Sequence, residues 1–418
     1  MPALAQEKKI LWHFLPFWLF LALFKFAGSL HYSLLSPLGA RLLPVWLVGL
    51  IIGGGSVVQL LLDVPVGRLM DRRGYVRFLL FGTAAFLLAG VAWMFRFTTF
   101  AYAASFVLST AGWQFFGPGV NAYVLSQAPD GRAATFISFR DVFESLGVVV
   151  ASAVLGFVLS TSTSAMGFIV ADGMLLGILA LLFAPRGTRN VQTRRQLATH
   201  DFFAGRHALG TVLAALRRLN PASTMLLIST FASSTFYGVV WFVVPLVIAG
   251  EAHAGILGFG LGVFDFAIVA LGFLLGSLAD RGNKRALVFF GLLLFSVSGV
   301  VLGFHFDWLF LIFGFLATAG DEMASISLWS WMHALDRTHV EDGTVSGAIN
   351  LFDDLGWAVG PILAGILYGA IGASWTIVSA AALIFAGWIA YQFLMHAHVP
   401  VPAGADVPAM PRRARHKR

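Results

Sequence analysis

The chain lacks cysteine altogether and has few charged residues. With no cysteine in 418 residues, disulfide bonds, thiolate metal sites and cysteine nucleophiles are excluded. Asp, Glu, Lys and Arg together make up 11% of the chain, whereas soluble globular proteins carry roughly 25%. Such scarcity of charge excludes a cytosolic enzyme and a disordered chain, and it indicates a protein that lies in a lipid bilayer.

Hydrophobic residues make up 58% of the chain and form long runs. A membrane-spanning helix takes about 20 apolar residues, and runs of that length lie at residues 11–31, 45–69, 76–95, 99–126, 134–160, 166–185, 223–249, 254–278, 286–304, 307–334, 346–371 and 374–396. The first run is too long for the apolar part of a cleavable signal peptide, so we expect none. The pattern predicts an all-α integral membrane protein with twelve transmembrane helices in two six-helix bundles.

Basic residues predict the orientation of these helices. If the amino terminus is cytoplasmic, only Arg41 and Arg96 of the 27 lysine and arginine residues fall on the outer side, and Lys25 lies within a span. This bias follows the positive-inside rule. It predicts a multi-pass protein of the cytoplasmic (inner) membrane with both termini in the cytoplasm. Because the topology accounts for the net charge of +7, we expect no nucleic-acid partner.

The spans divide the chain into four segments. We expect an N-terminal six-helix bundle at 1–185, a cytoplasmic linker at 186–222, a C-terminal six-helix bundle at 223–396 and a basic disordered tail at 397–418. In the linker, helical spacing of the apolar residues predicts an amphipathic helix on the membrane surface. Those residues are Leu209, Val212, Leu213 and Leu216.

An internal repeat relates the two bundles. Asp71 and Asp280 are separated by 209 positions, and so are Glu144 of FESLG and Asp353 of FDDLG. Each pair stands at the equivalent span. Duplicated six-helix halves form a transporter architecture in which the substrate site lies between the halves near the midplane of the membrane.

The string GRLMDRRG at Gly67–Gly74, with a weaker copy at Gly276–Lys284, resembles the signature loop of the major facilitator superfamily. The resemblance covers essentially the whole chain and implies a secondary transporter. In that family the loop joins spans 2 and 3 in the cytoplasm, and its charges latch the outward-facing state. This chain departs from the pattern at Tyr75, where the family has a basic residue. Many proton-driven drug exporters of the family have an arginine in span 4, and this chain has none there. The resemblance therefore does not imply proton coupling through such an arginine.

We interpret a set of polar and glycine residues as a cytoplasmic gate. Glycines in the signature loop let two helix ends approach and turn tightly, and an ion pair there would favour one arrangement of the halves. The set is Asp63, Gly67, Asp71, Arg72, Gly74, Arg77, Arg140, Asp141, Glu144, Asp280, Arg281, Asp353 and Asp354. The alternatives are a positive-inside stop signal with an incidental aspartate, and acids that merely lie near the membrane surface.

Acidic residues within the spans are candidates for proton coupling. A charge at the bilayer centre costs roughly 2.5–3.5 kcal/mol, and low dielectric disfavours the charged form of a carboxyl group. Asp265 in span 8 and the adjacent Asp321 and Glu322 in span 10 lie deepest. Neighbours on a helix face directions about 100° apart, so we expect one member of the adjacent pair to face the cavity. The alternative is a structural hydrogen-bonding role.

The family resemblance places spans 1, 4, 7 and 10 around the substrate cavity. It nominates Trp18, Lys25, Trp113, Gln114, Asn121, Tyr237, Trp241 and Trp329. Aromatic rings combined with acids suit an amphipathic or cationic organic solute. Lys25 itself could hold an anionic substrate, neutralise an acid or extend toward the outer surface.

Span 11 contains Gly356, Gly360, Pro361 and Gly365. Small residues predict close helix packing, and the proline predicts a hinge. This stretch resembles the motif of antiporters that contains an adjacent glycine and proline. In exporters that motif lies in span 5 rather than span 11, so the resemblance favours export only weakly.

The sequence predicts a secondary active transporter of a small organic solute that works by alternating access, with proton-coupled export of drug-like or metabolite compounds as the leading hypothesis. The alternatives are a proton-coupled importer of a small nutrient and a lipid or lysolipid flippase. An integral-membrane enzyme and a receptor are less consistent with the tiny outer loops and the repeat. No ATP-binding loop occurs, and no metal-ligand spacing appears. We expect no cofactor, a monomer, and the solute, protons and membrane lipid as partners.

Overall fold

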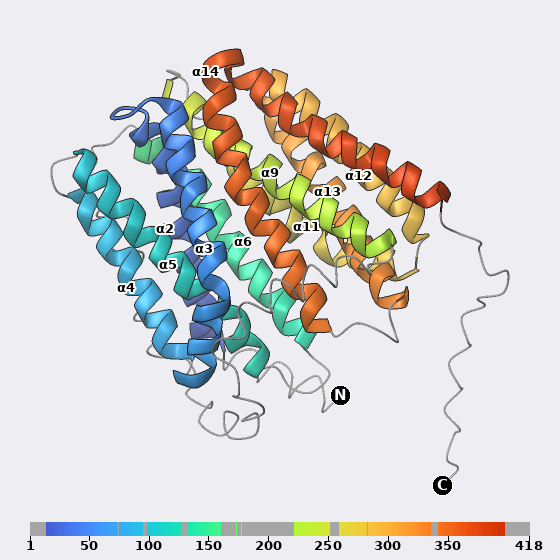
Figure 1. Ribbon diagram of the computed structural model, residues 1–418, viewed down its shortest axis with the longest axis horizontal. Helices are drawn as coiled ribbons and strands as arrows, with labels where there is room; N and C mark the ends of the chain where they lie inside the picture. Colours follow the sequence, from blue (N-terminus) through green and yellow to red (C-terminus); the bar gives the residue numbers. More distant parts are fainter. Residues whose placement is uncertain are drawn as a thin grey trace, which may run out of the picture.

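The computed structural model describes residues 14–73, 75–94, 98–127, 133–159, 173, 177, 221–250, 259–281, 283–335 and 342–397. Every regular element within these residues is a helix (Figure 1). The described ranges hold 10 helices, and 5 of the apolar segments are long enough to cross a membrane. The prediction of an all-helical membrane fold is therefore confirmed.

The helices coincide with the predicted spans in two groups. The first group is α2 (Leu15–Gly39), α3 (Val45–Arg73), α4 (Tyr75–Met94), α5 (Thr99–Gln127) and α6 (Ala133–Leu159). The second group is α9 (Pro221–Gly250), α11 (Gly260–Arg281), α12 (Lys284–Phe304), α13 (Trp308–Leu335) and α14 (Asp342–Ala397), which covers two predicted spans.

Some predicted segments fall outside the described residues. The span at 166–185 is described only at Gly173 and Gly177, so the total of twelve helices stays a prediction. The amphipathic helix of the linker and the basic tail from residue 398 also lie outside the described ranges.

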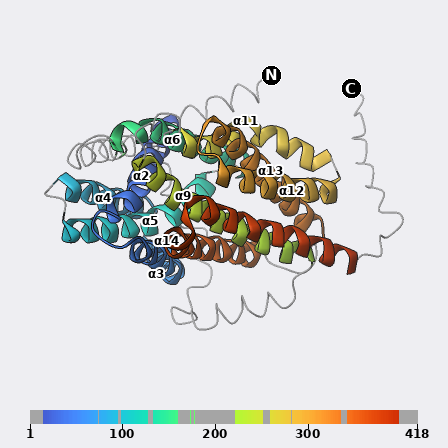
Figure 2. The same ribbon diagram turned by 90° about the horizontal axis from the view of Figure 1, so that it is seen from above.

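The two groups lie side by side and meet along three helix pairs. Seen from above, α4 lies at one end and α12 and α13 at the other, with α9 and α14 between them (Figure 2). Within the groups, α2 packs on α6, α4 on α5, α9 on α14 and α12 on α13. Between the groups, α2 contacts α9, α3 contacts α14 and α6 contacts α11.

Short polar side chains begin two of the helices. The Asn283 side chain accepts a hydrogen bond from the Arg285 backbone N–H at 3.1 Å and caps α12. Asp307 accepts one from the Leu309 backbone N–H at 2.8 Å and caps α13. Each cap satisfies an N–H group that has no partner in the first helical turn.

Helix α14 breaks at a glycine between the two spans that it covers. Gly372 has φ 77° and ψ 176°, a backbone conformation that is essentially restricted to glycine, and α14 turns back on itself there (Figure 1). The sequence predicted a hinge at Pro361. Pro361 lies inside the helix, so that hinge stays a prediction, and Gly372, the residue of α14 with non-helical angles, falls between the spans predicted at 346–371 and 374–396. Packing against neighbouring helices holds the chain helical through the proline.

Equivalent glycines make equivalent contacts in the two groups. Gly147 of α6 lies against the backbone carbonyl of Ala22 in α2, and Gly356 of α14 lies against that of Phe231 in α9. Both members of the second pair follow those of the first by 209 positions. The contacts of the folded chain thus follow the repeat that the sequence predicts.

Glycines also bring the two groups together. A Cβ on Gly53 of α3 would collide with the backbone carbonyl of Ala358 in α14. A Cβ on Gly262 of α11 would lie 3.0 Å from the Cβ of Ser152 in α6. Small residues allow the close backbone approach that stabilises helix contacts in membranes.

The outward surface is strongly apolar. Phe100 is 82% exposed, and Phe81, Leu274 and Phe393 are also largely exposed. A soluble monomer rarely shows contiguous apolar surface of this kind, so we interpret this surface as the one that faces lipid.

Candidate functional site

The centre of the first helix group holds an ion pair. Lys25 lies in the middle of α2, and its Nζ is 3.0 Å from Oε2 of Glu144 in the middle of α6. The two side chains are 26% and 17% exposed. The Lys25 Nζ also lies 5.0 Å from the ring centroid of Trp113 in α5, a distance at which a cation is attracted to an aromatic face. Of the three predictions for Lys25, pairing with a midplane acid is the one that these contacts support.

Arg140 extends this ion pair along α6. Its Nε donates to Oδ1 of Asp141 at 2.9 Å and lies 3.8 Å from Oε1 of Glu144, one helical turn away. Glu144 therefore has one oxygen near Arg140 and the other on Lys25. The two cations and two carboxylates are balanced in charge.

In the second helix group, hydroxyl groups hold the carboxylate of Asp321. Asp321 of α13 is 8% exposed. Its Oδ2 accepts a hydrogen bond from the Tyr237 hydroxyl of α9 at 3.2 Å, and its Oδ1 lies 3.5 Å from the Ser325 hydroxyl. The Tyr237 hydroxyl also lies 3.4 Å from Oγ1 of Thr318. Asp321 is thus an acid held by neutral hydroxyl groups.

Glu322 differs from its neighbour Asp321. Its side chain is partly accessible, and within the described part of the chain it makes no hydrogen bond or ion pair. Its charge interacts with those of Asp321, Asp265 and, from the other helix group, Asp141. Because adjacent residues on a helix face different directions, Asp321 can pack between α9 and α13 while Glu322 remains accessible.

Two further contacts complete the network. Ser145 of α6 lies next to the Asp265 carboxylate of α11, which brings the two groups into polar contact. The Ser234 hydroxyl of α9 donates a short hydrogen bond to Oδ1 of Asp353 in α14. The charge of Lys25 acts on both Asp265 and Asp353.

The ionisable residues therefore form one interacting set, which we call the charge network. Its members are Lys25, Arg140, Asp141, Glu144, Asp265, Asp321, Glu322 and Asp353. The sequence assigned these residues to a substrate cavity, a cytoplasmic gate and a separate group of coupling acids. The structure groups them differently, because helices from both halves bring together positions that are far apart in the sequence.

The predicted gate loops are described only in part. Gly74 lies outside the described residues, and so do the side chains of Asp63, Asp71, Arg72, Asp280 and Arg281 and the surroundings of Gly67. Arg77 is exposed, and Asp354 is half-buried in α14. The role of these residues in a gate stays a prediction.

The predicted cavity residues differ in burial. Trp18 is packed against Phe17 and Phe143 in the core, which argues against a cavity position. Gln114 is also buried, whereas Trp113 and Tyr237 are half-buried and contact the charge network. The side chains of Asn121 and Trp329 lie outside what the structure describes.

The sequence nominated Trp241, which is buried, as a cavity residue but missed the aromatic contact that it makes between the groups. Tyr32 of α2 meets Trp241 of α9 and Trp357 of α14 edge to face, at 6.4 and 6.0 Å between ring centroids. Nearby, the Ser36 hydroxyl donates to the Phe242 carbonyl at 2.8 Å.

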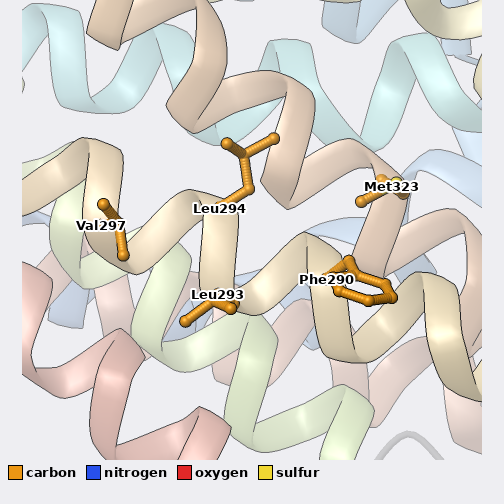
Figure 3. A pocket seen from close by; sticks show the side chains of 5 residues that line it. All are labelled: Phe290, Leu293, Leu294, Val297 and Met323. Atoms are coloured by element: carbon orange, nitrogen blue, oxygen red, sulfur yellow. The ribbon is translucent and has the colours of Figure 1, made fainter.

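An apolar hollow on the outer face is separate from the charge network. Phe290, Leu293, Leu294 and Val297 of α12 line it together with Met323 of α13 (Figure 3). Phe290 is 58% exposed, and the lining offers no polar group. We interpret the hollow as part of the surface that faces lipid acyl chains. Among the described residues, no group of three or more His, Cys, Asp or Glu side chains could hold a metal ion.

Apolar helices that enclose a polar, ionisable centre shared by two halves define a multi-pass membrane transporter. The family model of the Major Facilitator Superfamily matches residues 10–223 and 226–415. The chain belongs to this superfamily and is a secondary transporter of small solutes. Members of the family are generally not enzymes. No curated protein matches the chain.

Proposed function

We propose that the protein exports small organic compounds, drug-like molecules or metabolites, in exchange for protons across the cytoplasmic (inner) membrane. The observation that carries the proposal is the charge network, which combines six carboxyl groups with only two cations, Lys25 and Arg140. In this proposal the chain forms twelve membrane-spanning helices, and both termini lie in the cytoplasm, as the basic residues predict.

Proton coupling follows from the position of Glu322. A carboxyl group in a low-dielectric environment is neutral more readily than one in water. Glu322 has no ion pair among the described residues, and its charge acts on Asp141 of the other helix group. Protonation of Glu322 removes a repulsion between the two groups. Proton binding therefore changes their preferred arrangement, which is the linkage that a coupled transporter needs.

Contacts between the groups support an inward-facing conformation. In the predicted orientation, three of these contacts lie toward the outer side of the membrane. They are Ser36 with Phe242, Gly53 with Ala358, and Ser152 with Gly262. A transporter closed on the outer side gives the cytoplasm access to its centre.

The test is proton movement in proteoliposomes that contain a pH-sensitive dye, with pools of candidate organic solutes added to wild type and Glu322→Gln. We expect solute-dependent proton flux in wild type and its loss in the variant, because the amide is a permanent neutral mimic of the protonated acid. Glu322→Asp keeps the titrating group and is the matched control.

The outcomes separate the remaining hypotheses. Proton movement against the direction of the solute supports export, whereas movement together with the solute indicates an importer. Flux that persists in Glu322→Gln would transfer the coupling role to Asp321 or Asp265. Folded protein without flux for any pool would exclude proton coupling for those solutes, and fluorescent-lipid translocation would then test a flippase.

A further inference from the structure

The ammonium group of Lys25 is held as a bound organic ammonium would be. A carboxylate oxygen of Glu144 lies 3.0 Å from it, and the face of Trp113 lies 5.0 Å away. Carboxylates and aromatic faces are the groups that proteins use to recognise ammonium ions. The lysine chain tethers this cation, so the geometry describes an occupied cation site.

The aromatic wall of this site is fixed independently of Lys25. Phe24 and Phe86 contact the Trp113 ring edge to face, at 5.4 and 5.3 Å between centroids. Gly28, one turn after Lys25, leaves room for the ring, because a Cβ there would lie 2.9 Å from the indole. Trp113 therefore keeps its place if the lysine side chain moves away.

Lys25 has other carboxylates to move to. Its charge acts on Asp265 and Asp353 of the second helix group, and its side chain is 26% exposed rather than locked in the core. Arg140 remains near the other oxygen of Glu144, at 3.8 Å. Departure of the ammonium thus frees Oε2 of Glu144 and the Trp113 face, and leaves the rest of the site in place.

The internal repeat indicates that this site exists in one half only. The position 209 residues after Lys25 is Ser234, and the position 209 residues after Glu144 is Asp353. Ser234 and Asp353 contact each other as Lys25 and Glu144 do. A serine hydroxyl carries no charge, so the equivalent position of the second half carries no tethered cation.

We infer that Lys25 is a built-in competitor of the transported solute, and that the solute is an organic ammonium ion that displaces the lysine from Glu144 and Trp113. This inference rests on the proposed function and names the class of solute. An anionic solute would instead meet the surplus of carboxylates in the charge network. Competition of this kind lets the solute itself release Lys25 toward the acids of the second group.

The test is equilibrium binding of benzyltrimethylammonium to the purified full-length chain in detergent. Lys25→Ala removes the competitor, and we expect it to bind the probe at least about tenfold tighter than wild type, the scale of one partly desolvated cation–aromatic contact. Lys25→Arg keeps a cation and should show no such gain. Neopentylbenzene, the uncharged analogue of the probe, should bind wild type and Lys25→Ala alike.

Further variants make the result decisive. The gain should disappear in the double variants Lys25→Ala/Glu144→Gln and Lys25→Ala/Trp113→Leu. If Lys25→Ala does not fold, Lys25→Met removes the charge while keeping the stem and should change affinity in the same direction. Unchanged or weaker probe binding in folded Lys25→Ala would overturn the inference, as would a gain that survives Glu144→Gln. The assay needs no proton gradient, so proton-coupled flux that persists beside such a result would leave the proposed function standing.

Discussion

Oxidation of a Ser152→Cys/Gly262→Cys double variant is expected to stop transport, and reduction to restore it. The Ser152 Cβ lies 3.0 Å from the place of a Cβ on Gly262, and a disulfide needs about 3.5–4.5 Å between these atoms. A small separation of α6 and α11 is enough to form the bond. Because α6 and α11 belong to different helix groups, the bond would hold the groups together where an alternating-access cycle must part them.

Because the chain has no cysteine, the two introduced thiols are the only ones that can react with the oxidant. No other thiol exists in the chain, so the unmodified protein serves directly as the background. Solute flux is measured before oxidation, after oxidation and after reduction, and mass spectrometry reports the extent of cross-linking. Each single-cysteine variant should be insensitive to the oxidant. Full transport by completely cross-linked protein would show that α6 and α11 do not separate during the cycle.

Gly360→Leu is expected to destabilise the second helix group severely. A Cβ on Gly360 of α14 would lie 2.7 Å from the Thr235 carbonyl oxygen and 2.9 Å from the Gly238 Cα of α9. These are backbone atoms, which cannot move aside as a side chain can. Overpacking costs typically 1–3 kcal/mol, and we expect about 3 kcal/mol here because both neighbours are main chain.

The matched control lies on the same helix. No atom lies within 4 Å of a Cβ on Gly369, so Gly369→Leu should leave stability nearly unchanged. The measurement is the fraction of monodisperse protein that survives heating in detergent, followed by size-exclusion chromatography. Equal survival of the two variants would mean that α9 and α14 are not packed through Gly360.

The sequence was a sound guide to helix packing and to the boundary between the last two spans. The small residues of span 11 predicted close contacts, and Gly356, Gly360 and Gly365 all lie against the backbone of a neighbouring helix. Helix α14 breaks at Gly372, between the spans that the sequence predicts at 346–371 and 374–396, and the hinge at Pro361 stays a prediction. A proline only weakens a helix locally, and neighbouring helices decide whether it bends.

The candidate residues were found from the sequence, but their grouping was not. Charges within apolar runs stand out because each one is costly in a bilayer, and Lys25, Glu144 and Glu322 were all recognised in this way. The sequence put these residues into different functional groups. The ion pair of Lys25 with Glu144 joins α2 to α6, and no periodicity within one helix reveals a partner that another helix supplies.

Sequence alone determined that the chain is an apolar helical membrane protein with an internal repeat, because hydrophobic run length and charge placement are local properties that the bilayer selects directly. The tertiary structure decided which face of each helix meets which neighbour. That choice brings Asp141 and Asp265 from different halves within electrostatic reach of Glu322, and it sets the Lys25 ammonium against the Trp113 ring. Both contacts depend on how each helix is rotated about its own axis. Because the helices are apolar on nearly every face, the hydrophobic pattern leaves this rotation open, and packing against neighbouring helices fixes it.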